Sequence, residues 1–248
     1  MESVAFIPAR AGSVRLRDKN FLDLAGRPLF EWTVAQALEI EDFTEVIFST
    51  DSKDYAAYAL DCFGHKTKFR VHYRDETDSS GTARIYEVIK RLRESKEMKA
   101  DMLTLMLPTA PIRRKSTITS NLALSRESGC SVFSAASYDF HVPFAFERGQ
   151  ETSNGWKPLF SDSPMLTGNT RSQDQVNYFH PTGTISTIQF GGSASLPNTL
   201  YTGAKFLPIS RFENLDIDTS EDLLLTRLVA SSYIHADSWP FLPEDMDH

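Results

Sequence analysis

Strand and helix patterns alternate through the first half of the chain, and this constrains the fold more than any other feature. Short apolar runs typical of strands are separated by longer amphipathic stretches typical of helices. The order favours an α/β fold, with a mainly parallel sheet flanked by helices. The expected strands are 4–7, 46–49, 69–73, 102–107 and 131–136, and the expected helices are 29–40, 52–63, 82–93 and 116–125.

The alternation breaks at Tyr138. The stretch 138–182 is irregular and rich in Gly, Pro, Asn and Ser, and loops of that length are uncommon inside a compact domain. We expect a lid, a small subdomain or an oligomerisation arm there. Strand patterns return at 183–190 and 205–208, and a short strand at 215–218 leads into a helix at 220–231, capped by Thr219 or Ser220. One domain over 1–231 and a loosely packed tail over 232–248 are therefore expected.

Composition narrows the classes of function. The chain has 248 residues and a formal net charge of -7, which disfavours a nucleic-acid partner. Cys62 and Cys130 lie in apolar stretches without metal-like spacing, which fits a reducing compartment. The first residues run directly into a strand, and no apolar run approaches the roughly 18 residues that span a bilayer. We expect no secretory signal, no membrane partner and a cytoplasmic location.

The loop after the first strand combines small residues with cations. Arg10, Arg15, Arg17 and Lys19 fall within ten residues, around the small residues 11–13. Free backbone N–H groups beside fixed cations suit a triphosphate. The loop matches neither GxGxxG nor GxxxxGK[ST], so it is neither a dinucleotide fingerprint nor a P-loop.

Other polar loops are expected at the same edge of the sheet, because ligands of open parallel sheets bind beyond the carboxyl ends of the strands. These loops are 50–51, 74–82 and 108–113. Each has a structural alternative: a helix cap for the first, an exposed charged turn for the second, and a rigid proline turn for the third. The cluster 113–115 is either an anion site or a solvated helix start.

Asp216 and Asp218 alternate with the apolar residues Leu215 and Ile217. In a strand both carboxylates would share one face, where like charges repel unless a cation binds. Carboxylates together with phosphates are the usual ligands of Mg²⁺. The alternative is a charged edge strand followed by a helix cap.

Four motifs, in order, resemble those of the CMP-sugar synthetases, the acylneuraminate cytidylyltransferases. IPARAGSVRLRDKN (7–20) is similar to the opening motif IPARGGSKRIPRKN, and VIFSTD (46–51) to the second strand. LPTAPIR (107–113) resembles PTSPLR, and LDIDTSEDL (215–223) resembles the metal-binding element. NTRSQD (169–174), followed by His180 and Gly183, is similar to the pseudaminic acid branch, whereas PTGTIS (181–186) matches neither this branch nor the sialic and legionaminic branches fully.

The resemblance implies a Rossmann-like nucleotide-diphospho-sugar transferase fold and a reaction of CTP with a 2-keto-3-deoxy acid sugar. The products would be a CMP-sugar and pyrophosphate, with Mg²⁺ as cofactor. It also implies a homodimer in which the irregular arm 138–182 reaches into the partner's site. The alternatives are an N-acetylneuraminate, legionaminate or Kdo-type transferase, a nucleotide-sugar pyrophosphorylase, or a non-catalytic nucleotide-binding relative.

The matching positions imply residue roles. Catalysis would involve Arg10, Lys19 and Asp218, and the metal would be bound by Asp216 and Asp218. The sugar would be bound by Arg171, Gln173 and His180. The nucleotide would be bound by Ala9, Arg10, Ala11, Gly12, Ser13, Arg15, Lys19, Asn20, Arg74, Pro108 and Thr109. Two positions depart from the family pattern: Val14 replaces a common Lys, and Leu107 replaces a frequent Gln.

Overall fold

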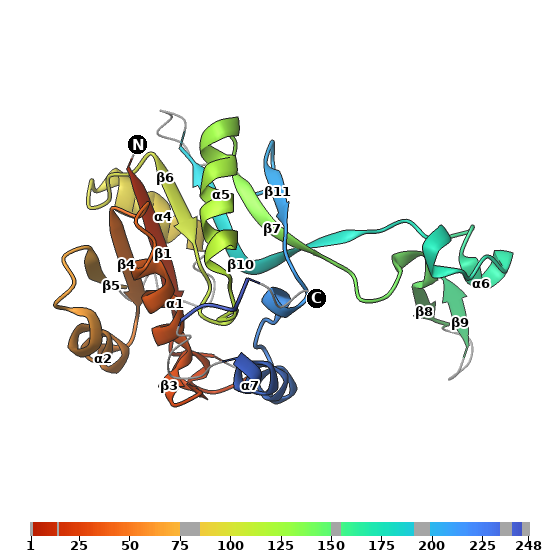
Figure 1. Ribbon diagram of the computed structural model, residues 1–248, viewed down its shortest axis with the longest axis horizontal. Helices are drawn as coiled ribbons and strands as arrows, with labels where there is room; N and C mark the ends of the chain where they lie inside the picture. Colours follow the sequence, from red (N-terminus) through yellow and green to blue (C-terminus); the bar gives the residue numbers. More distant parts are fainter. Residues whose placement is uncertain are drawn as a thin grey trace. The chain divides into compact units, whose positions relative to one another are not determined.

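The central element of the computed structural model is a seven-stranded sheet with the order β11-β7-β10-β6-β1-β4-β5 (Figure 1). The structure describes residues 2–13, 15–74, 85–149, 155–190, 199–233 and 240–244. The strands of this sheet are β1 (Ser3–Ala9), β4 (Glu45–Thr50), β5 (Phe69–Tyr73), β6 (Met102–Leu105), β7 (Val132–Ser137), β10 (Phe179–Gln189) and β11 (Lys205–Pro208). The principal helices are α1 (Leu29–Leu38), α2 (Lys53–Phe63), α4 (Ile85–Glu94), α5 (Lys115–Ser128) and α7 (Ser220–Tyr233).

The strand directions confirm the predicted mainly parallel sheet. β1 pairs in parallel with both β4 and β6, and β4 pairs in parallel with β5. β10 runs antiparallel to β6. The four parallel strands therefore present their carboxyl ends, and the loops that follow them, at one edge of the sheet, with Ala9 opposite Thr50.

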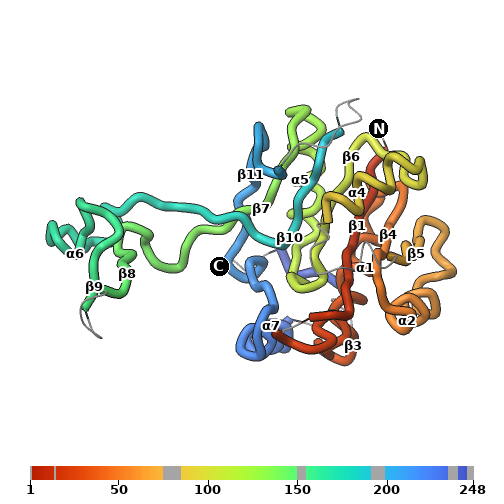
Figure 2. Tube along the Cα trace, turned by 180° about the vertical axis from the view of Figure 1, so that it is seen from behind, coloured from red at the N-terminus to blue at the C-terminus, as the bar shows by residue number. Residues whose placement is uncertain are grey.

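Helices cover both faces of the sheet because successive strand residues point to opposite sides. Ala5, Ile7 and Phe48 are buried in a cluster with residues of α1, α2 and α5. Phe6 and Ile47, which alternate with them, are buried against α4. The view from behind shows α4 on the face opposite to α5 (Figure 2). Burial of these apolar side chains is the main stabilising contribution, at about 25 cal/mol per Å² of apolar surface.

Side-chain caps fix where two helices begin. Ser52 Oγ accepts the N–H of Tyr55 at the start of α2. At the start of α7, Thr219 Oγ1 accepts the N–H of Asp222 at 3.2 Å, while Asp222 Oδ2 accepts the N–H of Thr219 at 2.7 Å. This reciprocal pair satisfies backbone donors that the helix itself leaves unpaired. It confirms Thr219 as the predicted cap.

The chain divides into two compact units, one of residues 1–134 and 182–248 and the other of residues 135–181. The second unit contains a small antiparallel pair, β8 (Phe146–Arg148) with β9 (Trp156–Pro158), and the short helix α6 (Pro164–Thr167). Many of its large apolar side chains are exposed: Tyr138, Phe140, Phe146, Trp156, Leu159, Leu166, Val176 and Tyr178. The proposed role of 138–182 as a dimer arm stays a prediction.

Two expectations are wrong. Residues 215–218 do not form a strand, because among the described residues their backbone pairs with no neighbouring strand; the Ile217 N–H donates instead to Thr109 O in a loop. The alternation of buried and exposed side chains nevertheless persists, with Ile217 buried and Asp216 exposed. Residues 240–244 are packed rather than loose: Leu242 is 2% exposed and its N–H donates to Arg113 O.

Some expectations fall outside the described residues, namely those for Val14, for the charged turn 75–82, for the first residues of the helix at 82–93, and for 234–239 and 245–248 of the tail. Cys62 and Cys130 are free thiols. In the described ranges we find no helix with the length and apolar character needed to cross a membrane.

Candidate active site

A cavity of about 470 Å³ lies beside the loop that follows β1. The loop supplies three cations to it, and the residue before the α7 cap supplies a carboxylate. Residues from two distant parts of the sequence therefore form one polar pocket. Its lining consists of Arg10, Gly12, Ser13, Arg15, Leu16, Lys19 and Asp218.

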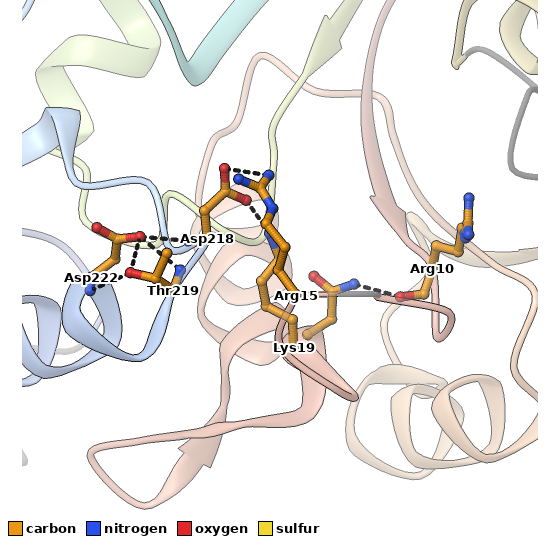
Figure 3. Close-up of polar contacts among 7 residues, drawn as sticks. Arg10, Arg15, Lys19, Asp218, Thr219 and Asp222 are labelled. Atoms are coloured by element: carbon orange, nitrogen blue, oxygen red, sulfur yellow. Dashed lines mark hydrogen bonds and ion pairs between the residues drawn. The ribbon is translucent and has the colours of Figure 1, made fainter. Parts of the chain in front are cut away.

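Asp218 is the centre of charge in this pocket. Its Oδ1 accepts from Lys19 Nζ at 2.9 Å and its Oδ2 accepts from Arg15 Nη2 at 2.7 Å (Figure 3). The hydrogen bond from Lys19, opposed in part by burial, lowers the pKa of Asp218, and Arg15 adds to the shift. The carboxylate is therefore ionised at neutral pH and balances the charges of two cations.

The two cations differ in exposure. The Lys19 side chain is 15% exposed, whereas that of Arg15 is 69% exposed. Arg15 can therefore leave Asp218 with little loss of packing, because an exposed ion pair contributes only about 0–1 kcal/mol. The Arg17 side chain is 95% exposed and is not part of the cavity lining. Three of the four predicted cations come together here, and Arg17 does not.

The loop itself is held by contacts that the sequence did not predict. Asp51 Oδ1 accepts the N–H of Ala11 at 2.9 Å, and Ala11 O accepts the N–H of Ser13. Two of the N–H groups expected to be free are thus used inside the protein. The N–H of Gly12 has no acceptor in the part of the chain that the structure describes. Asp51 therefore shapes the loop, and the cap of α2 is Ser52 instead.

Arg10 is placed differently from Lys19 and Arg15. Its Nη2 donates to Gly12 O at 3.0 Å, and in Figure 3 its guanidinium does not point toward Asp218. Its backbone carbonyl accepts from Asn20 Nδ2 at 2.9 Å. Asn20 is buried and so fixes the backbone at Arg10. Arg10 lines the cavity as a second centre of positive charge.

Other predicted nucleotide contacts are not among the residues that line the cavity. Ala9 is fully buried at the end of β1. Arg74 is 5% exposed, and its Nε donates to Ser49 Oγ at 2.9 Å. Pro108 and Thr109 follow β6, and Thr109 O accepts the N–H of Ile217 at 2.7 Å. The last of these bonds connects the loop after β6 to the segment that carries Asp216 and Asp218.

The predicted metal ligands fit a cation only if other groups complete the coordination. Asp218 lines the cavity, and Asp216 is exposed on the same segment, outside the lining. Among the described residues there is no group of three or more His, Cys, Asp or Glu side chains placed to hold a metal. Two carboxylates plus phosphate oxygens is the coordination typical of Mg²⁺. The donor set is therefore suited to a metal that arrives with a phosphate ligand.

Arg113 is a structural residue, a role that differs from both alternatives predicted for the cluster 113–115. It has no exposed surface, and it donates to Leu107 O, Thr184 O, Thr33 Oγ1 and Gln36 Oε1. Burial lowers its pKa to about 9, against the opposing effect of Glu213 and Asp216. It is neither an anion site nor a solvated helix start.

Arg114 is likewise buried, in an ion pair of 3.0 Å between its Nη1 and Glu213 Oε2. Its neighbour in the cluster, Lys115, is exposed at the start of α5. The three adjacent cations therefore have three different environments. A run of basic residues in the sequence gives no signal that separates them, because the partners come from remote segments.

The predicted sugar-binding residues all lie in the second unit. Arg171 and Gln173 are exposed at a short 3₁₀ turn, Ser172–Asp174. His180 lies at the start of β10, where its ring is 4.8 Å from that of Tyr138, centroid to centroid. These side chains share one unit, and their role in binding a sugar stays a prediction.

Several known proteins are similar to this chain in sequence. A family model described as cytidylyltransferase matches residues 4–104. The chain is 36% identical, over 138 residues, to the CMP-N,N'-diacetyllegionaminic acid synthase of Legionella pneumophila. This match covers 55% of this chain and 58% of that relative. The chain is 27% identical, over 238 residues, to the pseudaminic acid cytidylyltransferase of Campylobacter jejuni strain 81-176. This match covers 92% of this chain and 96% of that relative.

A solved structure of a CMP:2-keto-3-deoxy-manno-octonic acid synthetase complexed with CTP is similar in fold. The TM-score is 0.63 at 20% identity, and the match covers 94% of this chain and 99% of that one. This likeness confirms the predicted Rossmann-like fold.

Proposed function

We propose that the chain is a member of the CMP-sugar synthetase family of cytidylyltransferases and that it transfers the cytidylyl group of CTP to a nonulosonic acid sugar. The observation that carries the proposal is the cavity in which Asp218 faces Lys19 and Arg15 beside the loop after β1. A site with paired cations, a carboxylate and an open volume suits a triphosphate with its metal. The products are the CMP-sugar and pyrophosphate.

In the proposed reaction the anomeric hydroxyl oxygen of the sugar forms a bond to the α-phosphorus of CTP. The bond from that phosphorus to the oxygen it shares with the β-phosphorus breaks, that oxygen leaves with pyrophosphate, and the hydroxyl proton passes to solvent or to a phosphate oxygen. Such a transfer depends on positioning and on stabilisation of charge more than on covalent help from the protein. The cationic side chains around the cavity are of the type that stabilisation of charge requires.

Lys19, Arg15 and Arg10 would neutralise charge on the triphosphate and on the leaving pyrophosphate. The Lys19 side chain is largely buried, so the surrounding atoms restrain it, whereas the exposed side chain of Arg15 can turn from Asp218 to a phosphate. Release of Asp218 from its cations would free its oxygens for a metal. Asp216 and Asp218 would hold Mg²⁺, which would supply positive charge that stabilises the phosphates during the transfer.

We propose pseudaminic acid or a close relative as the sugar. The support is the NTRSQD stretch at 169–174 and the match over 92% of the chain to a pseudaminic acid cytidylyltransferase. Arg171 would pair with the carboxylate of the sugar, because a planar guanidinium can donate two parallel hydrogen bonds to a carboxylate. The legionaminic acid relative, at 36% identity over 55% of the chain, makes legionaminic acid the first competitor.

The test is pyrophosphate release with Mg²⁺ and CTP, run against pseudaminic, legionaminic, N-acetylneuraminic and Kdo-type acids. We expect turnover with one nonulosonic acid, and the preferred acid identifies the branch. Competition with ATP, GTP and UTP tests the choice of nucleotide. Binding of CTP without turnover of any acid would contradict the proposal and favour a non-catalytic relative.

A homodimer is part of the proposal. The support is the exposure of apolar side chains on the second unit, including Phe140 at 70% and Val176 at 63%. Contiguous apolar patches on a monomer commonly mark interaction sites. Sedimentation velocity at micromolar concentration should give the mass of two chains, and a single species of one chain would contradict this.

A further inference from the structure

Gly183 lies in β10 at a point where three segments of the chain meet. A Cβ added there would be 2.9 Å from Leu107 Cδ1 and 3.3 Å from Asp216 Oδ2. Leu107 follows β6, and Asp216 precedes α7. The backbone of Gly183 is outside the left-handed region, so its conformation does not require glycine. What requires glycine is the space taken by a side chain and a carboxylate from elsewhere.

The surrounding backbone has little freedom to move apart. The buried guanidinium of Arg113 donates to Leu107 O at 2.6 Å and to Thr184 O at 2.8 Å. It thereby links the loop after β6 to the residue that follows Gly183. The N–H of Ile217 donates to Thr109 O and holds the segment of Asp216 against the same loop. An added methyl group must therefore be accommodated by side chains, because backbone movement would break these bonds.

We propose that Gly183 is a positioning residue for Asp216. Its bare backbone leaves the Asp216 carboxylate at the place from which, with Asp218, it would hold a divalent cation. This inference rests on the proposed function and deepens it. In Gly183→Ala the new methyl group displaces the end of Leu107, which is half-buried and can rotate. It also displaces the Asp216 carboxylate away from β10, while the fold is kept.

The test measures binding of Mn²⁺ by electron paramagnetic resonance in the presence of CTP, which needs no turnover. We expect Gly183→Ala to weaken Mn²⁺ binding about tenfold or more, which is the range seen when groups that orient metal ligands are changed. Leu107→Ala alone should keep the affinity of the wild type. Adding Leu107→Ala to Gly183→Ala should restore part of the loss, because the shorter side chain gives the methyl group room.

A double-mutant cycle shows whether the effect passes through Asp216. In the Asp216→Ala background, Gly183→Ala should cause no further loss of Mn²⁺ affinity. If Gly183→Ala binds Mn²⁺ like the wild type, if the loss is as large without Asp216, or if Leu107→Ala restores nothing, the positioning role is wrong. A wild type that binds no Mn²⁺ with CTP also overturns it.

Kinetics separate this inference from the proposed function. If the wild type binds Mn²⁺ but releases no pyrophosphate with any acid, the proposed function fails while the Mn²⁺ comparison still decides the role of Gly183. If the wild type is active, Gly183→Ala should lower kcat with little change in the KM for CTP. Urea unfolding of the variant confirms that it is folded.

Discussion

At the scale of single residues, Asp218 is the side chain on which the site depends most. Both of its oxygens accept from cations, and those cations come from a loop about 200 residues earlier in the chain. The two cations that pair with Asp218 are already in place to bind a polyanionic ligand. When such a ligand binds the cations, the carboxylate becomes available to a metal. The loss of this group removes charge stabilisation that chain packing cannot replace.

We predict that Asp218→Ala and Arg10→Ala each lower kcat/KM for CTP by about 10²–10³, the usual effect of removing one charge-stabilising group. The measurement is pyrophosphate release at saturating acid sugar. Arg17→Ala is the matched control, because Arg17 belongs to the same loop but is 95% exposed and outside the cavity lining. Wild-type rates in either test variant would refute the assignment.

At the scale of elements, the cap of α7 fixes both the start of a helix and the segment that carries Asp218. Asp222 Oδ2 accepts the N–H groups of Asp218 and Thr219 as well as the hydroxyl of Thr219. These hydrogen bonds outweigh the opposing effect of burial and lower the pKa of Asp222. The helix start is therefore also the support for the backbone of Asp218.

We predict that Thr219→Val and Asp222→Asn each lower the free energy of unfolding by about 1 kcal/mol at pH 7, as lost caps usually do. Because the pKa of Asp222 is lowered by folding, its contribution is full above the unfolded pKa of about 3.9 and is lost as pH falls through the folded pKa. The difference between wild type and Asp222→Asn should therefore shrink in acid.

Urea unfolding at several pH values measures this, with Ser231→Ala as control. Ser231 lies on the same helix, is exposed, and donates to Leu228 O within that helix. A cap variant whose cost equals that of the control at pH 7 would contradict the prediction.

At the scale of the whole molecule, the end of the chain closes the main unit. Pro240 O accepts from Gln36 of α1, and Pro243 O accepts from Arg114. Glu244 accepts from the backbone N–H of Ser116 at 3.0 Å. Leu242 packs into a cluster with Ile112 and Tyr233. Leu242 is thus part of the core, although the tail around it is acidic and Pro-containing in sequence.

Leu242→Ala should lower the free energy of unfolding by about 2–5 kcal/mol, the cost of truncating a buried Leu. Leu224→Ala makes the same chemical change at a position that is 59% exposed, and should cost less than about 0.5 kcal/mol. Urea unfolding compares the two. Equal and small costs would show that the tail is not packed in solution.

The sequence by itself determined the chain order of the strands of the seven-stranded sheet and of the principal helices, the loop of cations after β1 and the cap of α7. These depend on residues close together in the chain, whose periodicity and side-chain chemistry act locally. Only the tertiary structure decided that Arg17 stays outside the pocket, that Asp51 binds the loop, that Arg113 is buried and that Gly183 lies against Asp216. Each depends on contacts between segments far apart in sequence, and a local pattern carries no information about which remote group will fill a given space.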